Sequence, residues 1–233
     1  MDIGIIGSGQ IGGTLTRRLT ALGHNVSIAN SRGPASLAEL SAETGARAVT
    51  VEEAARARDI VIVAIPQAAV PQLPPDLFSG TSAVVVDTGN YYPSRDGKIE
   101  ELEEGGMTES EWVSKHLGRP VVKAFNHIGA RSLGTVGQPA GTPGRISLSI
   151  AGDDARDKEV VLKLIDELGF DGLDAGTLAD SWRQQPGTPA YLHDLDSTAR
   201  KAALAQADAL KIAHYRAEAD EAARPYFDKA RQS

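Results

Sequence analysis

The sequence contains no cysteine, which excludes disulfide bonds and thiolate metal sites. The chain also has no excess of basic residues. It contains 24 Lys and Arg against 31 Asp and Glu, which gives a net charge of -7 at pH 7. Such a chain cannot neutralise a phosphate backbone, so we expect no nucleic-acid partner. No stretch approaches the roughly 18 apolar residues that a membrane helix needs, and we expect no membrane partner. The first strand pattern starts at Ile3 and leaves no room for a signal peptide. We therefore predict a cytoplasmic protein.

Short apolar runs alternate with helical patterns in the first half of the chain. The apolar runs lie at 3–6, 25–29, 47–49, 59–65, 83–86 and 121–124, with helix patterns at 10–22, 36–44 and 51–56. Two of these runs, 60–65 and 84–86, are continuously apolar, as strands covered on both faces should be. This alternation predicts an α/β fold with a doubly wound parallel Rossmann sheet.

The second half predicts a small α/β extension and a long terminal helix. A helix pattern at 109–117 precedes a Gly- and Pro-rich stretch, 129–144, that we interpret as a surface loop. A strand at 146–150, a helix at 155–168 with Asp153 as its N-cap, and a strand at 170–173 form the extension. Residues 198–230 predict one long helix that is interrupted near Pro225. We expect this helix to pack against the rest of the chain or to form the interface of a homodimer. The predicted domains are 1–180, a nucleotide-binding domain with its extension, and 181–233, a helical segment.

A glycine-rich turn follows the first strand and opens the first helix. It consists of Gly7, Ser8, Gly9, Gln10, Ile11 and Gly12 and matches G-x-G-x-x-G in its required context between strand and helix. Gly7 permits the tight turn, Gly9 lets a pyrophosphate approach the backbone, and Gly12 allows the helix to pack closely on the strand. The N–H groups at the helix start attract phosphate. The turn therefore predicts a dinucleotide site.

The end of the second strand indicates which dinucleotide is bound. It reads Asn30-Ser31-Arg32, and no carboxylate follows until Glu39. NAD sites place an Asp or Glu here to bind the ribose hydroxyls. Arg32 can instead pair with a 2′-phosphate, and Ser31 can add a hydroxyl. The sequence therefore predicts NADP(H) as the cofactor.

Further motifs resemble those of a known family. They are A-I-P at 64–66, K-A-F-N at 123–126, A-G-D-D at 151–154 and L-D-A-G-T-L at 173–178. Together with the turn and the S-R pair, they make most of the first 180 residues similar to NADPH-dependent reductases of the deazaflavin coenzyme F-420. The resemblance implies direct hydride exchange between nicotinamide and deazaflavin at the carboxyl edge of the sheet. It places Ile65 and Pro66 along the cofactor groove, and Asn126 and His127 near the nicotinamide.

The sequence departs from that family after Ser181. The second substrate therefore stays open between F-420 and a flavin such as FMN, which related domains of membrane ferric reductases pair with NADPH. The resemblance predicts an oxidoreductase that transfers a hydride between NADP(H) and a deazaflavin or flavin. Two alternatives remain, an NADPH-dependent reductase of a small carbonyl or imine and a non-catalytic NADPH-sensing module.

The candidate catalytic groups follow from these alternatives. Hydride transfer between two rings is mainly a matter of positioning, whereas a carbonyl or imine also needs a proton donor. His127, at the end of a predicted strand, is the catalytic candidate, with a groove-lining role as its alternative. Asn90 either orients the nicotinamide amide or terminates a strand. Tyr91 and Tyr92 either stack on a ring or lie in the core or a subunit contact, and we favour the latter. We expect no metal site.

Substitution of Arg32 tests the predicted cofactor. Arg32→Ala removes a charge-assisted pair with the 2′-phosphate and should weaken NADPH binding by about 2–3 kcal/mol. NADH lacks that phosphate, so its affinity should hardly change. Titration of both nucleotides into wild type and variant measures the difference, and equal losses would contradict the specificity argument.

Overall fold

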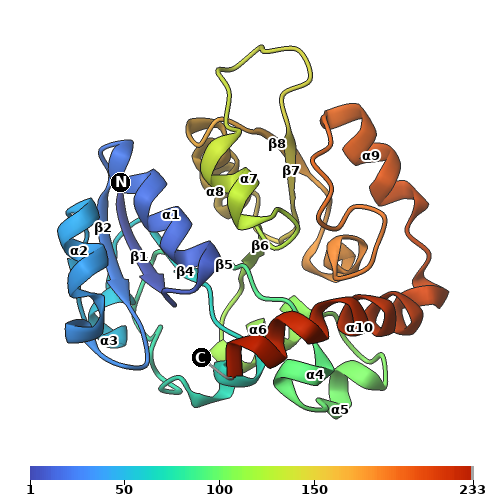
Figure 1. The fold of residues 1–233 in the computed structure, drawn as a ribbon, viewed down its shortest axis with the longest axis horizontal. Helices are drawn as coiled ribbons and strands as arrows, with labels where there is room; N and C mark the ends of the chain where they lie inside the picture. The colour runs from blue at the N-terminus through green and yellow to red at the C-terminus, as the bar shows by residue number, and fades with distance from the viewer. Residues whose placement is uncertain (232–233) are drawn as a thin grey trace.

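The computed structural model describes residues 1–231, which contain a six-stranded parallel sheet in the order β3-β2-β1-β4-β5-β6. Its strands are β1 (Asp2–Ile6), β2 (Asn25–Ala29), β3 (Arg47–Ala48), β4 (Ile60–Val63), β5 (Val84–Asp87) and β6 (Val122–Lys123). The sheet is the central layer of the N-terminal part of the molecule (Figure 1). This order confirms the predicted Rossmann fold, in which the strand order reverses beside β1 and leaves a crevice at the carboxyl edge.

Both faces of the sheet are covered, which explains the continuous apolar runs. On one face, Ile60 and Ile62 pack in a core with α1 (Gln10–Ala21), α7 (Ala130–Thr135) and α8 (Ala155–Glu167). On the other face, Val61 and Val63 pack in a second core with α3 (Val51–Ala54) and α6 (Glu109–Leu117). Successive residues of β4 therefore enter opposite cores, because side chains alternate along a strand.

The remaining helices lie around this framework. They are α2 (Ala38–Thr44), α4 (Pro93–Asp96), α5 (Glu100–Glu103), α9 (Ser197–Gln206) and α10 (Ile212–Arg231). Short 3-10 helices occur at Pro34–Leu37, Gln67–Gln72, Leu178–Gln184 and Ala209–Lys211. No helix within residues 1–231 combines the length and the apolar composition needed to cross a membrane.

The C-terminal extension forms as predicted, with two differences in detail. Strands β7 (Ser147–Ile150) and β8 (Asp171–Asp174) pair in parallel and are connected by α8. The side chain of Asp154, and not that of Asp153, caps α8, while Asp153 accepts from the N–H of Leu178 at 2.9 Å. The predicted loop 129–144 contains α7. This helix is only six residues long, too short for the sequence to show helical periodicity.

The predicted interruption of the terminal helix at Pro225 is wrong. The chain leaves helical geometry between α9 and α10, where the Asp208 carboxylate accepts from the N–H of Leu210 at 3.0 Å. Helix α10 continues through Pro225. Ala207 is extended, with a ψ of 132°, and Asp208 is the N-cap of the 3-10 helix that precedes α10. Helix α10 then packs along α4 (Figure 1).

A buried ion pair lies directly below the carboxyl edge of the sheet. The ammonium of Lys123 donates to Asp87 Oδ2 at 3.0 Å and to the carbonyl of Gly89 at 2.6 Å. Asp87 also accepts from Ser110 Oγ at 2.7 Å and from the N–H of Gly89 at 2.7 Å. Both charged side chains are almost completely buried. The pair therefore fixes the backbone of the loop that follows β5.

The adjacent carboxylate of Glu109 belongs to the same polar layer. It accepts from the N–H of Tyr91 at 3.1 Å, and the residue is 1% exposed. Burial raises the pKa of Glu109 to about 7, against the opposing effect of the nearby Lys123 charge. Burial of Tyr91 likewise agrees with the interpretation that this tyrosine lies in the core.

Removal of one member of the ion pair should destabilise the protein strongly. Lys123→Met leaves the Asp87 carboxylate buried without its cation and should cost about 3–5 kcal/mol of unfolding free energy. The double variant Asp87→Leu with Lys123→Met should recover part of this loss. Urea unfolding measures both. Lys115→Met, at an exposed lysine, is the control and should change the free energy of unfolding little. A loss in Lys123→Met no larger than in that control would contradict the role of the pair.

Candidate active site

The glycine turn brings the start of α1 against β1. A Cβ atom on Gly12 would lie 1.9 Å from the carbonyl oxygen of Gly7, and one on Gly7 would lie 2.1 Å from that of Ala64. Gly7 also has a φ of 110°, which side chains disfavour. A Cβ on Gly9, in contrast, would meet no atom within 4 Å. The turn is thus closed on its inner side and open at Gly9, as the approach of a diphosphate requires.

The first turn of α1 has no side-chain cap and no acidic residue. The N–H groups at a helix start need partners and carry partial positive charge. A phosphate group supplies both the acceptor and the negative charge. The local structure therefore fits the diphosphate of a dinucleotide at Ser8, Gly9, Gln10 and Ile11.

Asn30 connects the end of β2 to this turn. Its side-chain amide donates to Ser8 Oγ at 3.1 Å and to Ser36 Oγ at 3.0 Å, and its carbonyl oxygen accepts from the N–H of Arg32 at 3.0 Å. These bonds hold the Ser31-Arg32 segment beside the turn. Asn30 has no predicted role in the sequence, where its position between the second strand and Arg32 is the only signal for it.

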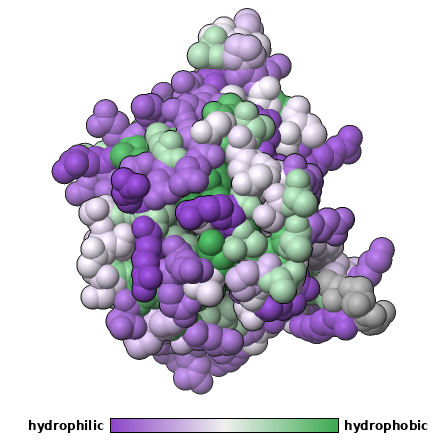
Figure 2. Space-filling model, turned by 90° about the vertical axis from the view of Figure 1, so that its left-hand side faces the viewer, coloured by the Kyte–Doolittle hydropathy of each residue, from purple (hydrophilic) through white to green (hydrophobic). Residues whose placement is uncertain are grey.

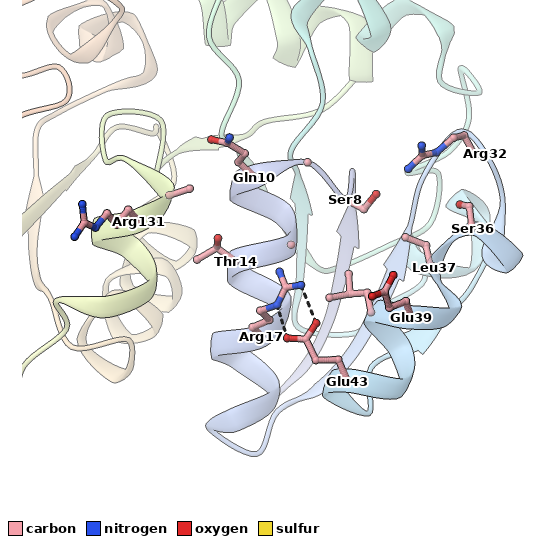
Figure 3. Close-up of a pocket in the computed structure, with 14 residues that line it drawn as sticks. Ser8, Gln10, Thr14, Arg17, Arg32, Ser36, Leu37, Glu39, Glu43 and Arg131 are labelled. Carbon is pink, nitrogen blue, oxygen red and sulfur yellow. Dashed lines mark hydrogen bonds and ion pairs between the residues drawn. The ribbon is translucent and has the colours of Figure 1, made fainter. Parts of the chain in front are cut away.

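Two adjacent cavities meet at Ser8, Gly9 and Arg32. One, of about 560 Å³, is lined on one side by apolar groups that include Val51, Ile65, Pro66 and Leu73. It suits an adenine ring. The other, of about 660 Å³, lies between α1 and α2. In Figure 3 the Arg32 side chain points toward Ser8 from across this second cavity.

The Arg17–Glu43 pair closes the far end of the second cavity. Arg17 Nε lies 2.6 Å from Glu43 Oε1, and a second bond makes the contact bidentate (Figure 3). Because the Glu43 charge is already paired, it opposes an anion at Arg32 less than a free carboxylate would.

The face of the molecule beside α2 is mostly hydrophilic, and hydrophobic surface is confined to small patches (Figure 2).

The carboxyl ends of β5 and β6 carry a second group of polar side chains. Asn126 Nδ2 donates to Asn90 Oδ1 at 3.0 Å and to the carbonyl of Gln184 at 2.7 Å. Asn90 Nδ2 donates to the carbonyl of Asn126 at 2.8 Å and to the Tyr191 hydroxyl at 3.3 Å. The structure thus joins two predicted site residues, Asn90 and Asn126, to two from the C-terminal segment. Parallel strands end at the same edge, where Rossmann folds bind their ligands.

Phe125 turns the chain toward this group. Its φ of 60° lies in the left-handed region, which costs a non-glycine residue about 1–2 kcal/mol. Residues hold such conformations only where their surroundings enforce them, and Phe125 is completely buried. The strained turn places Asn126 opposite Asn90.

His127 lies beneath the edge and is completely buried. Its Nε2 accepts from the N–H of Ser149 at 3.2 Å, so its proton is on Nδ1, which lies 3.3 Å from Asn126 Oδ1. Burial lowers the pKa of His127 well below its ordinary value, and the charges of Arg200 and Lys123 act in the same direction. A neutral imidazole with both nitrogens bonded inside the protein orients Asn126. This geometry favours a positioning role, and proton donation by His127 stays a prediction.

Fold and turn together define a Rossmann-type dinucleotide-binding protein. The chain belongs to the family described as NADP oxidoreductase, coenzyme F420-dependent, whose model matches residues 2–91. The chain is 35% identical to the hypothetical protein SMa0349 of Sinorhizobium meliloti, with a TM-score of 0.71 over 84% of this chain and 96% of that one. The family match supports an NADP-dependent oxidoreductase.

Two further relatives are more distant. The fold is shared with a protein of Arthrobacter sp. FB24 assigned as an F-420-dependent NADP reductase, at 23% identity and a TM-score of 0.62 over 88% and 89% of the two chains. The metalloreductase STEAP3 of Rattus norvegicus is 28% identical over 77% of this chain and 34% of its own length. The chain spans at most half the length of the curated relatives that it matches.

Substitution of Gly9 tests the turn. Gly9→Val suits the extended backbone there, and a Cβ at this position has no atom within 4 Å, so the protein should fold. Its side chain should occupy the diphosphate position and reduce the affinity for NADPH and NADH alike by at least 100-fold, which is about 2.7 kcal/mol. Gly106→Val, at another uncrowded glycine, is the matched control. Unchanged binding by Gly9→Val in a fluorescence titration would show that the diphosphate lies elsewhere.

Proposed function

We propose that this protein transfers a hydride reversibly between NADP(H) and a deazaflavin of the F-420 type. NADP(H) as the cofactor is supported by the position of Arg32 beside the open glycine turn. The hydrogen bonds of Asn30 hold the segment of Arg32 next to that turn. The family match over residues 2–91 supports a deazaflavin as the second substrate. Nothing in the comparisons favours FMN over F-420 as the second substrate.

The polar groups at the carboxyl edge suit this reaction. Asn90, Asn126 and Tyr191 are uncharged and bond to one another. Such side chains can position a donor ring against an acceptor ring through hydrogen bonds. Hydride transfer between rings depends chiefly on that positioning. In this proposal the nicotinamide lies beside Asn90 and Asn126, and Ile65 and Pro66 line another part of the cofactor groove.

A reductase of carbonyls or imines is the second candidate. It needs a proton donor at the edge, and two hydroxyl groups, those of Tyr92 and Tyr191, are bonded to each other there. The family description favours these two enzymatic candidates over a non-catalytic NADPH-sensing module.

Absorbance of the nicotinamide band tests the proposal. Purified protein is mixed with NADPH and, in separate reactions, with oxidised F-420, with FMN and with a panel of small carbonyls and imines. We expect oxidation of NADPH with F-420 and none with FMN. Turnover only with the carbonyl or imine panel would replace the first candidate by the second. Tight NADPH binding with no turnover of any acceptor would contradict both.

A further inference from the structure

The carboxyl edge contains a hydrogen-bond chain whose direction is fixed by backbone carbonyls. A backbone carbonyl can only accept, so the carbonyl of Gln184 requires that the nitrogen of the Asn126 amide faces it, at 2.7 Å. In the same way, the side-chain nitrogen of Asn90 must face the backbone carbonyl oxygen of Asn126, which is 2.8 Å away. The backbone carbonyls thus determine the orientation of both side-chain amides.

The orientation of Asn90 determines what Tyr191 can do. Asn90 Nδ2 has no lone pair to offer, so the Tyr191 oxygen, 3.3 Å away, must accept from it. The same oxygen is hydrogen-bonded to the hydroxyl of Tyr92. The two phenols hold two hydroxyl hydrogens, and only one of them can lie between the two oxygens. One of the two phenolic hydrogens therefore takes no part in the hydrogen bond between the tyrosines.

Within residues 1–231, neither hydroxyl oxygen has a further acceptor at hydrogen-bond distance. The bond to Asn90 polarises Tyr191, and chains in which all donors point the same way strengthen one another. The favoured arrangement therefore runs from Asn90 to Tyr191 to Tyr92. In it, the hydroxyl hydrogen of Tyr92 is the one left for a bound molecule.

The surroundings keep Tyr92 in its neutral, donating form. Burial raises the pKa of Tyr92, and the hydrogen bond from Tyr191 opposes this effect in part. Arg95 lies with its guanidinium carbon 5.3 Å from the centre of the Tyr92 ring. A nearby cation stabilises a phenolate, so it would ease the transient loss of the proton.

The C-terminal segment holds the tyrosines in place. The buried guanidinium of Arg200 donates to the carbonyls on both sides of Tyr191, those of Ala190 and His193, and to that of Ser147 in β7. On the other side, the ring of Phe227 in α10 meets that of Tyr92 edge-on at 5.1 Å. This is the part of the chain that departs from the family pattern after Ser181.

We propose that Tyr92, supported by Tyr191 and Asn90, donates the proton that accompanies hydride transfer. This inference rests on the proposed function, since it places the nicotinamide beside Asn90. The acceptor is then a molecule whose reducible carbon is conjugated to a carbonyl oxygen or a ring nitrogen. Its carbon gains the hydride, the bonding pair moves to the oxygen or nitrogen, and that atom takes the proton of Tyr92. Tyr92 regains a proton from solvent, so that NADPH, one proton and the acceptor give NADP+ and the reduced acceptor.

Three phenylalanine variants test the assignment by kinetics. Tyr92→Phe should lower kcat by about 100-fold, the smaller end of general acid catalysis, with the Kd for NADPH unchanged. Tyr191→Phe should lower kcat about tenfold, because it removes one supporting hydrogen bond. Tyr226→Phe, at a tyrosine that is 55% exposed, is the matched control and should have wild-type kcat. Wild-type kcat in Tyr92→Phe would overturn the proposal.

A second measurement does not depend on turnover. The chain has five tyrosines, so ring-labelled tyrosine gives few NMR signals, which the same three variants assign. Addition of NADP+ should shift the signals of Tyr92 and Tyr191 and leave that of Tyr226 in place. If NADP+ binds and the first two signals do not move, the inference fails while the cofactor assignment stands. If NADP+ does not bind at all, the proposed function fails.

Discussion

Close packing of α1 on β1 is the constraint on which the site depends. Gly12 and Gly7 allow it, because any side chain at either position would collide with a backbone carbonyl. The result is a helix whose uncapped first turn faces the crevice at the carboxyl edge. A dinucleotide bound there has its phosphates at the turn and its two ends on either side. The position of each remaining site residue follows from this arrangement.

The two ends of the crevice are built differently. At the β2 end, Asn30 and Arg32 form a charged and largely exposed site suited to a phosphate. At the β5 and β6 end, the groups are neutral, buried or half-buried, and connected by hydrogen bonds. The Asp87–Lys123 pair lies directly under this end and fixes the loop that holds Asn90. A charged side chain is therefore used for recognition at one end, and the groups that meet the reacting ring at the other end are neutral.

Local signals in the sequence were sufficient for the Rossmann sheet and the glycine turn. Each of these signals is contained in a short stretch of the chain. They are the alternating apolar runs, the glycines at 7, 9 and 12, and Arg32 after β2. Asn90 and Tyr191 are 101 positions apart and meet only in the folded chain, so no spacing rule could join them. The break before α10 lies at the extended Ala207 and at the capping residue Asp208, which form no periodic pattern. The cytoplasmic location, the homodimer and the division at residue 180 stay predictions.

The central claim is that the turn and the β2 end hold the diphosphate and the 2′-phosphate of one NADP molecule. A crystal structure of the protein with NADP+ tests it most directly. We expect the diphosphate against the N–H groups of Gly9 to Ile11 and the 2′-phosphate within hydrogen-bond distance of the Arg32 guanidinium. Nucleotide density in another cavity, or a 2′-phosphate pointing into solvent away from Arg32, would contradict the account.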